Sequence, residues 1–140
     1  MANEEIIANM MKISGYNLSC PCSVSQQAAI AALKSSSLII RRMSLEYEKR
    51  RNFIVAELNK IKGISCIKPE GTFYVFANIK GTGKSSEQIY DELLTKGRVV
   101  VIPGSAFGKQ GEGYIRIAYT LPIDRLREAV NRMRKVIEKE

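Results

Sequence analysis

Arg116 is the residue with the most specific chemical potential in this sequence, because it lies in an otherwise apolar, β-prone run from Gly113 to Thr120. Strand side chains alternate between two faces, so Tyr114 and Arg116 are predicted to share one face and the flanking isoleucines the other. Removing a guanidinium from water is costly, so a half-buried strand position predicts an anionic partner. The planar fork matches a carboxylate, which accepts two parallel hydrogen bonds. That carboxylate belongs either to a bound ligand or to the protein itself, with Glu70, Glu112 or another side chain as internal candidates.

The histidine and cysteine content excludes several other kinds of site. The 140-residue chain has no histidine and three cysteines, Cys20, Cys22 and Cys66. A zinc site usually takes four ligands from these residue types, and a Ser-His-Asp triad needs histidine, so neither site is expected. An odd number of cysteines without a disulfide framework is typical of the cytoplasm. The acidic N-terminus and the lack of an apolar run of about 20 residues agree with a cytoplasmic protein without membrane partners.

The formal net charge of +8 favours an acidic partner such as nucleic acid. However, the basic residues from Arg125 to Lys135 are interspersed with Asp124 and Glu128 and lie opposite an apolar helical stripe. This pattern is typical of a solvated helix face. The sequence has no basic loop interleaved with aromatic residues. No nucleic-acid partner is therefore expected, and a basic nucleic-acid-binding module is kept as an alternative function.

A glycine-rich segment, Gly81 to Ser85, resembles part of a phosphate-binding loop because it follows a predicted strand and precedes a predicted helix. The complete motif has another glycine five residues before Gly83, where this chain has Asn78. Without that glycine, the segment predicts a turn in which Ser85 or Ser86 caps the next helix.

The predicted elements divide the chain into a helical half and a mixed half. Three helices are expected first, at 3–13 with Asn3 as N-cap, at 24–34 with Ser23 as N-cap, and at 38–62 closed by Gly63. Strands follow at 64–68, 72–79, 98–102 and 113–120, and helices at 86–96 and 123–138. The expected fold class is α+β, in which N-terminal helices and a long connecting helix precede a β-β-α-β-β-α domain with helices packed on a small sheet.

Three short motifs of the second half follow one another in a distinctive order. They are Pro69-Glu70-Gly71-Thr72-Phe73-Tyr74-Val75-Phe76, Val99-Val100-Val101-Ile102-Pro103-Gly104-Ser105-Ala106-Phe107-Gly108 and Tyr114-Ile115-Arg116-Ile117-Ala118-Tyr119. These motifs resemble the small domain of the fold-type I, pyridoxal-phosphate (PLP)-dependent aminotransferases of class I/II, the aspartate aminotransferase-like group. The segment from Ser19 to Gln26 is similar to the stretch just downstream of the family's cofactor-binding lysine. The resemblance covers essentially the whole chain.

The resemblance implies roles for two residues. Arg116 matches the arginine that clamps the α-carboxylate of the substrate, and Phe73 matches an aromatic residue that lines the substrate side of the cleft. For Phe73, ordinary core packing on a strand is the alternative. Tyr74 and Phe76 are interpreted as core residues, and Phe107 is expected to pack beneath its loop.

One part of the family's pattern is absent from this sequence. The family holds PLP through a lysine in a Ser-x-x-Lys motif followed by Gly-x-Arg-x-Gly, and the combination does not occur here. The resemblance therefore implies the C-terminal part of an aminotransferase. Residues 1–37 would be a remnant of the large PLP-binding domain, residues 38–62 a connecting helix, and residues 63–140 the small domain.

The same resemblance implies the partners of the parent protein. The parent would use PLP, act on amino acids and 2-oxo acids, form a homodimer, and include the upstream large domain. This chain alone is expected to bind no cofactor, to contain no catalytic residue and to be inactive. The alternative is a non-catalytic, carboxylate-binding regulatory or scaffold domain that uses Arg116 without chemistry.

Overall fold

The computed structural model describes residues 3–35 and 37–138. The chain divides into two compact units, Met1–Ile40 and Arg41–Glu140. Among the described residues, no helix is both long and apolar enough to cross a membrane.

The first unit consists of helices. Helix α1, Glu4–Leu18, begins as predicted, because the Asn3 side-chain oxygen accepts a hydrogen bond from the Glu5 backbone N–H at 2.8 Å. Helix α2, Ser23–Lys34, differs from the prediction at its start, since Cys22 and not Ser23 is the N-cap, with no side-chain hydrogen bond. Neither helix has a buried residue.

Helix α3, Ser37–Leu58, begins in the first unit and continues into the second. It ends four residues before the predicted Lys62, because the chain tightens into turns in which the Ile61 N–H donates to the Leu58 carbonyl at 3.0 Å. Gly63 follows with a φ of +85°, a left-handed conformation that favours glycine. A Cβ at Gly63 would also lie 2.9 Å from the backbone of Gly81.

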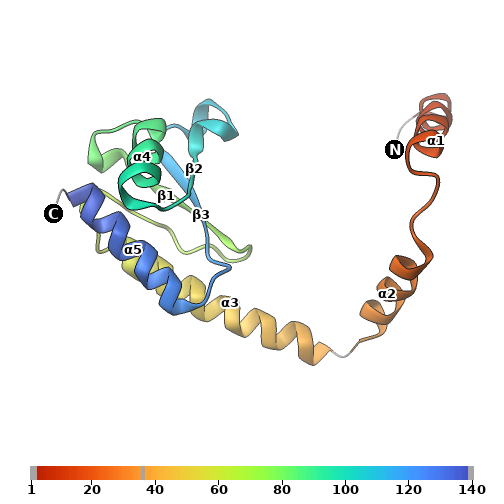
Figure 1. Ribbon diagram of the computed structural model, residues 1–140, viewed down its shortest axis with the longest axis horizontal. Coiled ribbons are helices and arrows are strands. Elements are labelled where there is room, and N and C mark those ends of the chain that lie inside the picture. The colour runs from red at the N-terminus through yellow and green to blue at the C-terminus, as the bar shows by residue number, and fades with distance from the viewer. Residues whose placement is uncertain (1–2, 36, 139–140) are drawn as a thin grey trace. The chain divides into compact units, whose positions relative to one another are not determined.

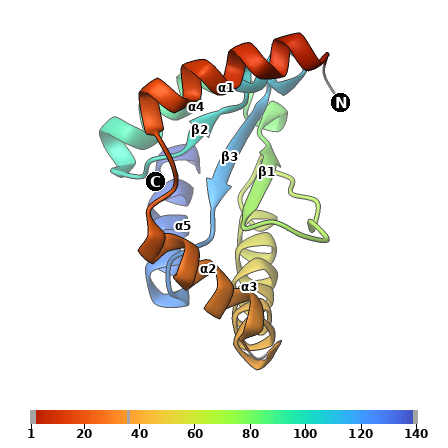
Figure 2. The same cartoon turned by 90° about the vertical axis from the view of Figure 1, so that its right-hand side faces the viewer.

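Three antiparallel strands form the sheet of the second unit. They are β1, Tyr74–Asn78; β2, Ile102–Pro103; and β3, Tyr114–Ala118. Their order is β1-β3-β2, so β3 lies in the centre (Figure 2). The central strand is therefore the one whose side chains have neighbours on both sides.

The strand predicted at 64–68 is not formed. Ser65 makes an isolated bridge to Asn78, with hydrogen bonds of 2.9 and 2.8 Å in the two directions. The next residue, Cys66, bonds to a side chain instead: its N–H donates to Asn59 Oδ1 at 2.8 Å and its carbonyl accepts from Asn59 Nδ2 at 2.9 Å. Because Asn59 satisfies these backbone groups, no ladder continues along this segment.

The strand predicted at 98–102 is also much shorter. Arg98 has a left-handed backbone with a φ of 51°, and the Val99 N–H donates to the Leu93 carbonyl at 2.9 Å, which joins this segment to the preceding helical turn. Of the predicted range, Ile102 pairs with β3. The segment is rich in β-prone residues, but a strand also needs a neighbouring strand to pair with, and most of this segment has none.

Helices α4 and α5 complete the second unit. Helix α4, Ser86–Glu92, continues into a π-helical turn, Leu93–Gly97, and α5 spans Ile123–Glu138, so both predicted ranges are confirmed. Helices α3 and α5 lie side by side (Figures 1 and 2). The core joins these helices to one face of the sheet, and its innermost residues are Ile54, Leu58, Ile61, Val75, Ala77, Ile79, Ile89, Leu93, Ile115, Tyr119, Leu126, Val130 and Met133. The predicted α+β fold class is confirmed.

Candidate carboxylate-binding site

Arg116 lies at the centre of the sheet. Its register partners are Phe76 on β1 and Ile102 on β2. Backbone alternation turns Ile115 and Ile117 into the core, where they are 0% and 7% exposed, and turns Arg116 to the opposite, open face. The arginine is half-buried there, as the strand pattern predicted.

Two aromatic rings lie close to the guanidinium. Its Cζ atom lies 4.2 Å from the ring centroid of Tyr74 and 4.9 Å from that of Phe107, within the range of cation–π interactions. Within residues 3–35 and 37–138, no carboxylate forms an ion pair with Arg116. Of the two named internal candidates, Glu112 instead accepts a hydrogen bond from the Ser86 backbone N–H at 2.9 Å. The described part of the chain therefore does not supply the anion that Arg116 was predicted to need.

More aromatic side chains extend the open face around these two rings. The Phe76 ring stacks on Tyr114, with centroids 5.2 Å apart, and meets Phe107 edge-on at 6.0 Å. Phe76 is 41% exposed and Tyr74 is half-buried, so their predicted place in the core is wrong. The reason is the register, because residues 74 and 76 share the face of Arg116 while Val75 and Ala77 face the core.

Phe73 lies beside this aromatic cluster. It is 44% exposed and precedes β1, and its ring centroid lies 4.3 Å from that of Tyr74. Its carbonyl accepts a hydrogen bond from the Tyr119 N–H at 3.0 Å, which fixes its backbone at the end of the sheet. The structure thus places Phe73 outside the core, and its connection to Arg116 runs through Tyr74.

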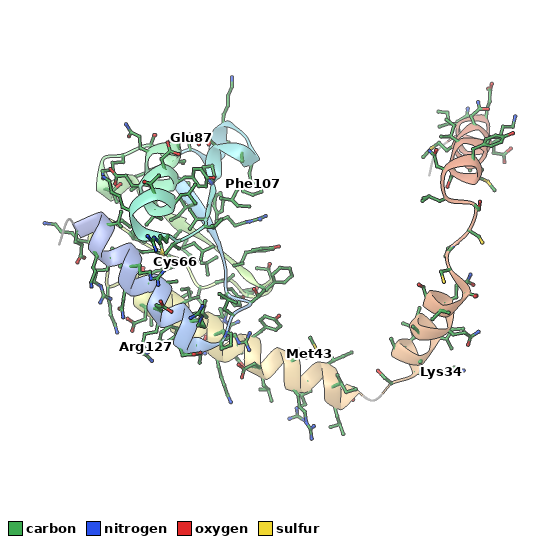
Figure 3. The ribbon with its side chains drawn as sticks, in the orientation of Figure 1. Lys34, Met43, Cys66, Glu87, Phe107 and Arg127 are labelled. Carbon is green, nitrogen blue, oxygen red and sulfur yellow. The ribbon has the colours of Figure 1, made fainter. Side chains whose placement is uncertain are left out.

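The loop between β2 and β3 positions Phe107. Phe107 ends a short 3-10 helix, Gly104–Phe107, and is 52% exposed rather than packed beneath the loop as expected (Figure 3). The Ser105 hydroxyl donates to Glu87 of α4 at 2.8 Å. At the base of the loop, Gly104 approaches Gly111 so closely that a Cβ on Gly104 would lie 2.0 Å from the Gly111 carbonyl oxygen.

The glycine-rich segment from Gly81 to Ser85 leads into helix α4 and caps its N-terminus. The Ser85 hydroxyl accepts from the Gln88 N–H, and the Gln88 side chain accepts from the Ser85 N–H, so the predicted cap is a complete capping box. The Lys84 ammonium pairs with Glu92. The lysine of this segment is therefore already engaged within the protein.

The basic residues of α5 are largely balanced by acidic or aromatic neighbours. Arg125 and Arg132 both pair with Glu128, and Arg127 lies 4.8 Å above the Phe53 ring of α3. The apolar stripe of the same helix is buried. This arrangement is the solvated face that the sequence predicted.

Tyr74 and Phe107 were not identified from the sequence as neighbours of Arg116. Each occurs in one of the three short motifs, but Arg116 lies 42 positions after Tyr74 in the chain. Their proximity depends on strand register and on the loop geometry, neither of which a single sequence specifies.

The chain was compared with known proteins. Residues 1–133 match the family model for aminotransferase class I and II. The chain is 45% identical over 142 residues to an aspartate aminotransferase of Pyrococcus horikoshii, covering 100% of this chain and 36% of that protein. It is 41% identical to aromatic-amino-acid aminotransferase 2 of Thermococcus litoralis, with coverage of 99% and 36%.

A solved structure gives the same result. The crystal structure of an aromatic aminotransferase from Pyrococcus horikoshii superimposes with a TM-score of 0.88 and 41% identity, covering 99% of this chain and 37% of that one. The chain thus spans about a third of the length of these relatives. The family match over residues 1–133, together with relatives above 40% identity, shows that this chain belongs to the class I and II aminotransferase family.

Proposed function

We propose that this chain is the C-terminal part of a PLP-dependent amino acid aminotransferase, in which Arg116 binds the α-carboxylate of the substrate. The observation that carries the proposal is the environment of the Arg116 side chain. It is a half-buried arginine on the central strand, and the described residues give it aromatic neighbours but no anion. A substrate carboxylate would complete this arrangement through two parallel hydrogen bonds.

Arg116 contributes binding and orientation. A bidentate contact fixes the direction of the substrate's Cα relative to the sheet. Because the substrate is already oriented when bound, less entropy is lost on reaching the transition state. In the parent, PLP supplies the electron sink for the chemistry at Cα. Phe73, exposed beside Tyr74, is proposed to line the substrate cleft of the parent and exclude water from it.

The described residues around Arg116 do not fit PLP itself. The guanidinium contacts the aromatic rings of Tyr74 and Phe107, neither of which carries an amine. PLP needs a lysine that forms a Schiff base and a cluster of donors for its phosphate. We therefore propose that the remainder of the parent holds the cofactor.

The proposal predicts that Arg116→Ala is severe in a full-length aminotransferase that carries this chain as its C-terminal part. Loss of the charge-assisted clamp should raise KM and lower kcat/KM for amino acids by at least about 100-fold. Arg116→Lys keeps the charge but loses the fork, so it should restore only part of the activity. Steady-state kinetics with several amino donors would measure both effects.

Two controls make this prediction specific to the carboxylate. Arg125→Ala removes a surface arginine that pairs with Glu128 and should leave kcat/KM unchanged. An amine that matches the amino acid but lacks its carboxylate should react equally slowly with the Arg116→Ala variant and with the unmodified enzyme. Unchanged kinetics for amino acids in Arg116→Ala would reject the clamp.

The 140 residues alone are proposed to be inactive, since they lack the Ser-x-x-Lys and Gly-x-Arg-x-Gly combination. The purified chain mixed with PLP, an amino donor and a 2-oxo acid should show no turnover, and no Schiff-base absorbance beyond that which PLP and the free donor form without protein. Turnover above a matched blank without protein would contradict this expectation.

A further inference from the structure

The contacts of Arg116 come from two different segments. Tyr74 is the first residue of β1, and Phe107 is the last residue of the short helix between β2 and β3. Their rings lie 4.2 and 4.9 Å from the Cζ atom of Arg116. The guanidinium is therefore in contact with one aromatic ring from a strand and one from a loop.

These contacts do not use the hydrogen-bonding capacity of the guanidinium. A cation–π contact is an attraction to the face of a ring, whereas the five N–H donors of a guanidinium bind acceptor atoms. Within residues 3–35 and 37–138, no hydrogen bond or ion pair involves the guanidinium of Arg116. The aromatic contacts can thus hold the group without occupying the donors that a carboxylate would need.

The two rings are themselves supported. The Tyr74 ring contacts Phe73 at 4.3 Å, and the Phe107 ring meets Phe76, which stacks on Tyr114. The loop that carries Phe107 is fixed by the close approach of its two glycines and by the hydrogen bond from Ser105 to Glu87. A guanidinium held by supported groups loses less conformational freedom when it binds a ligand.

We propose that Tyr74 and Phe107 are positioning residues that orient the Arg116 guanidinium for a carboxylate ligand. This inference rests on the proposed clamp role of Arg116 and adds the groups that prepare it. Both residues act through Arg116 and neither needs to touch the substrate. Aromatic character is the required property, because an aliphatic residue of similar size lacks the π face.

The first test uses the 140-residue chain. Nuclear magnetic resonance of the Arg116 side chain should show ring-current shifts of its Cδ protons, together with restricted motion at Nε. Tyr74→Leu and Phe107→Leu should each reduce both signatures, while Tyr74→Phe and Phe107→Tyr should retain them. Phe53→Leu removes a comparable ring from Arg127 and serves as the matched control, with no change at Arg116.

The second test measures kinetics in a full-length aminotransferase that carries this chain. Tyr74→Leu and Phe107→Leu should each lower kcat/KM for amino acids by roughly 3- to 30-fold, mainly through KM, since a cation–π contact is of that strength. The aromatic replacements should stay within about 2-fold. In an Arg116→Ala background the leucine variants should have no further effect, as expected for residues that act through Arg116.

The outcomes separate this inference from the clamp on which it rests. A large effect of Arg116→Ala with unchanged kinetics in both leucine variants would overturn the positioning role alone. A leucine effect that persists in full without Arg116, or one reproduced by the aromatic replacements, would also overturn it. If Arg116→Ala itself has no effect, the clamp proposal fails. Thermal denaturation of each variant confirms that the compared proteins are folded.

Discussion

At the scale of single residues, Arg116 and Cys66 show how similar placement in an apolar region leads to different chemistry. Arg116 is permanently charged, so it lies on the open face with aromatic contacts and donors available for a ligand. Cys66 can be neutral, and it is 6% exposed within the core. Burial raises the pKa of its thiol from 9.0 to about 11, because a thiolate would lose its hydration there.

This raised pKa predicts a loss of stability in alkali. Between pH 9.0 and about pH 11 the folded thiol keeps its proton while the unfolded thiol loses it, so the folded state binds more protons. The contribution of Cys66 to the free energy of unfolding is fully present below pH 9.0 and is lost as pH rises toward 11. Urea denaturation across this window should therefore show a smaller decline for Cys66→Ala than for the unmodified chain.

Cys20 offers the matched control for this experiment. It is exposed, so Cys20→Ala should leave the pH dependence of stability unchanged. An identical alkaline decline in Cys66→Ala and the unmodified chain would show that the buried thiol does not contribute.

At the scale of elements, the loop between β2 and β3 depends on a backbone contact between two glycines. A Cβ on Gly104 would lie 2.0 Å from the Gly111 carbonyl oxygen and 2.7 Å from that of Tyr114. Both obstacles are backbone atoms, which cannot move aside as a flexible side chain would. The loop conformation that brings Phe107 to Arg116 therefore requires glycine at position 104.

Gly104→Ala should consequently destabilise the second unit by at least about 2 kcal/mol, the scale of overpacking at a rigid site. The same substitution should weaken the Arg116 ring-current signature from Phe107. Gly71→Ala is the matched control, because no atom lies within 4 Å of its Cβ position, and its effect should be within about 0.5 kcal/mol. Urea denaturation of both variants measures the difference, and equal stability would refute the requirement.

At the scale of the whole molecule, the two units differ in how they bury apolar side chains. All residues of the core cluster come from Ile54 onward. In the first unit, by contrast, large apolar side chains are exposed, among them Ile6, Met10, Met11, Ile13, Tyr16, Leu18, Val24 and Leu33. Exposed apolar surface of this extent is typical of segments that pack against other parts of a larger protein.

Residues 41–140 alone are therefore predicted to fold. Their free energy of unfolding should lie within about 1 kcal/mol of the value for the 140-residue chain, because the core is unchanged. The shorter chain should also self-associate less as concentration rises, since it lacks most of the exposed apolar residues. Thermal denaturation and size-exclusion chromatography would measure both, and a shorter chain without cooperative unfolding would contradict the prediction.

The sequence by itself determined the presence and order of the helices, though not all of their ends, together with the strand face of Arg116 and the family resemblance. Each depends on local information: hydrophobic periodicity in α5, a capping asparagine at α1, and alternation along β3. The predicted strands at 64–68 and 98–102 were wrong or too long because β-prone composition does not specify a partner.

Only the tertiary structure decided which groups surround Arg116. Strand register placed Tyr74 and Phe76 on the open face rather than in the core, and the glycine contact in the loop brought Phe107 to the guanidinium. A shift of one residue in register would have reversed the two faces of β1. Side-chain neighbours across a sheet depend on pairings between distant segments, and a single sequence carries no local signal for those pairings.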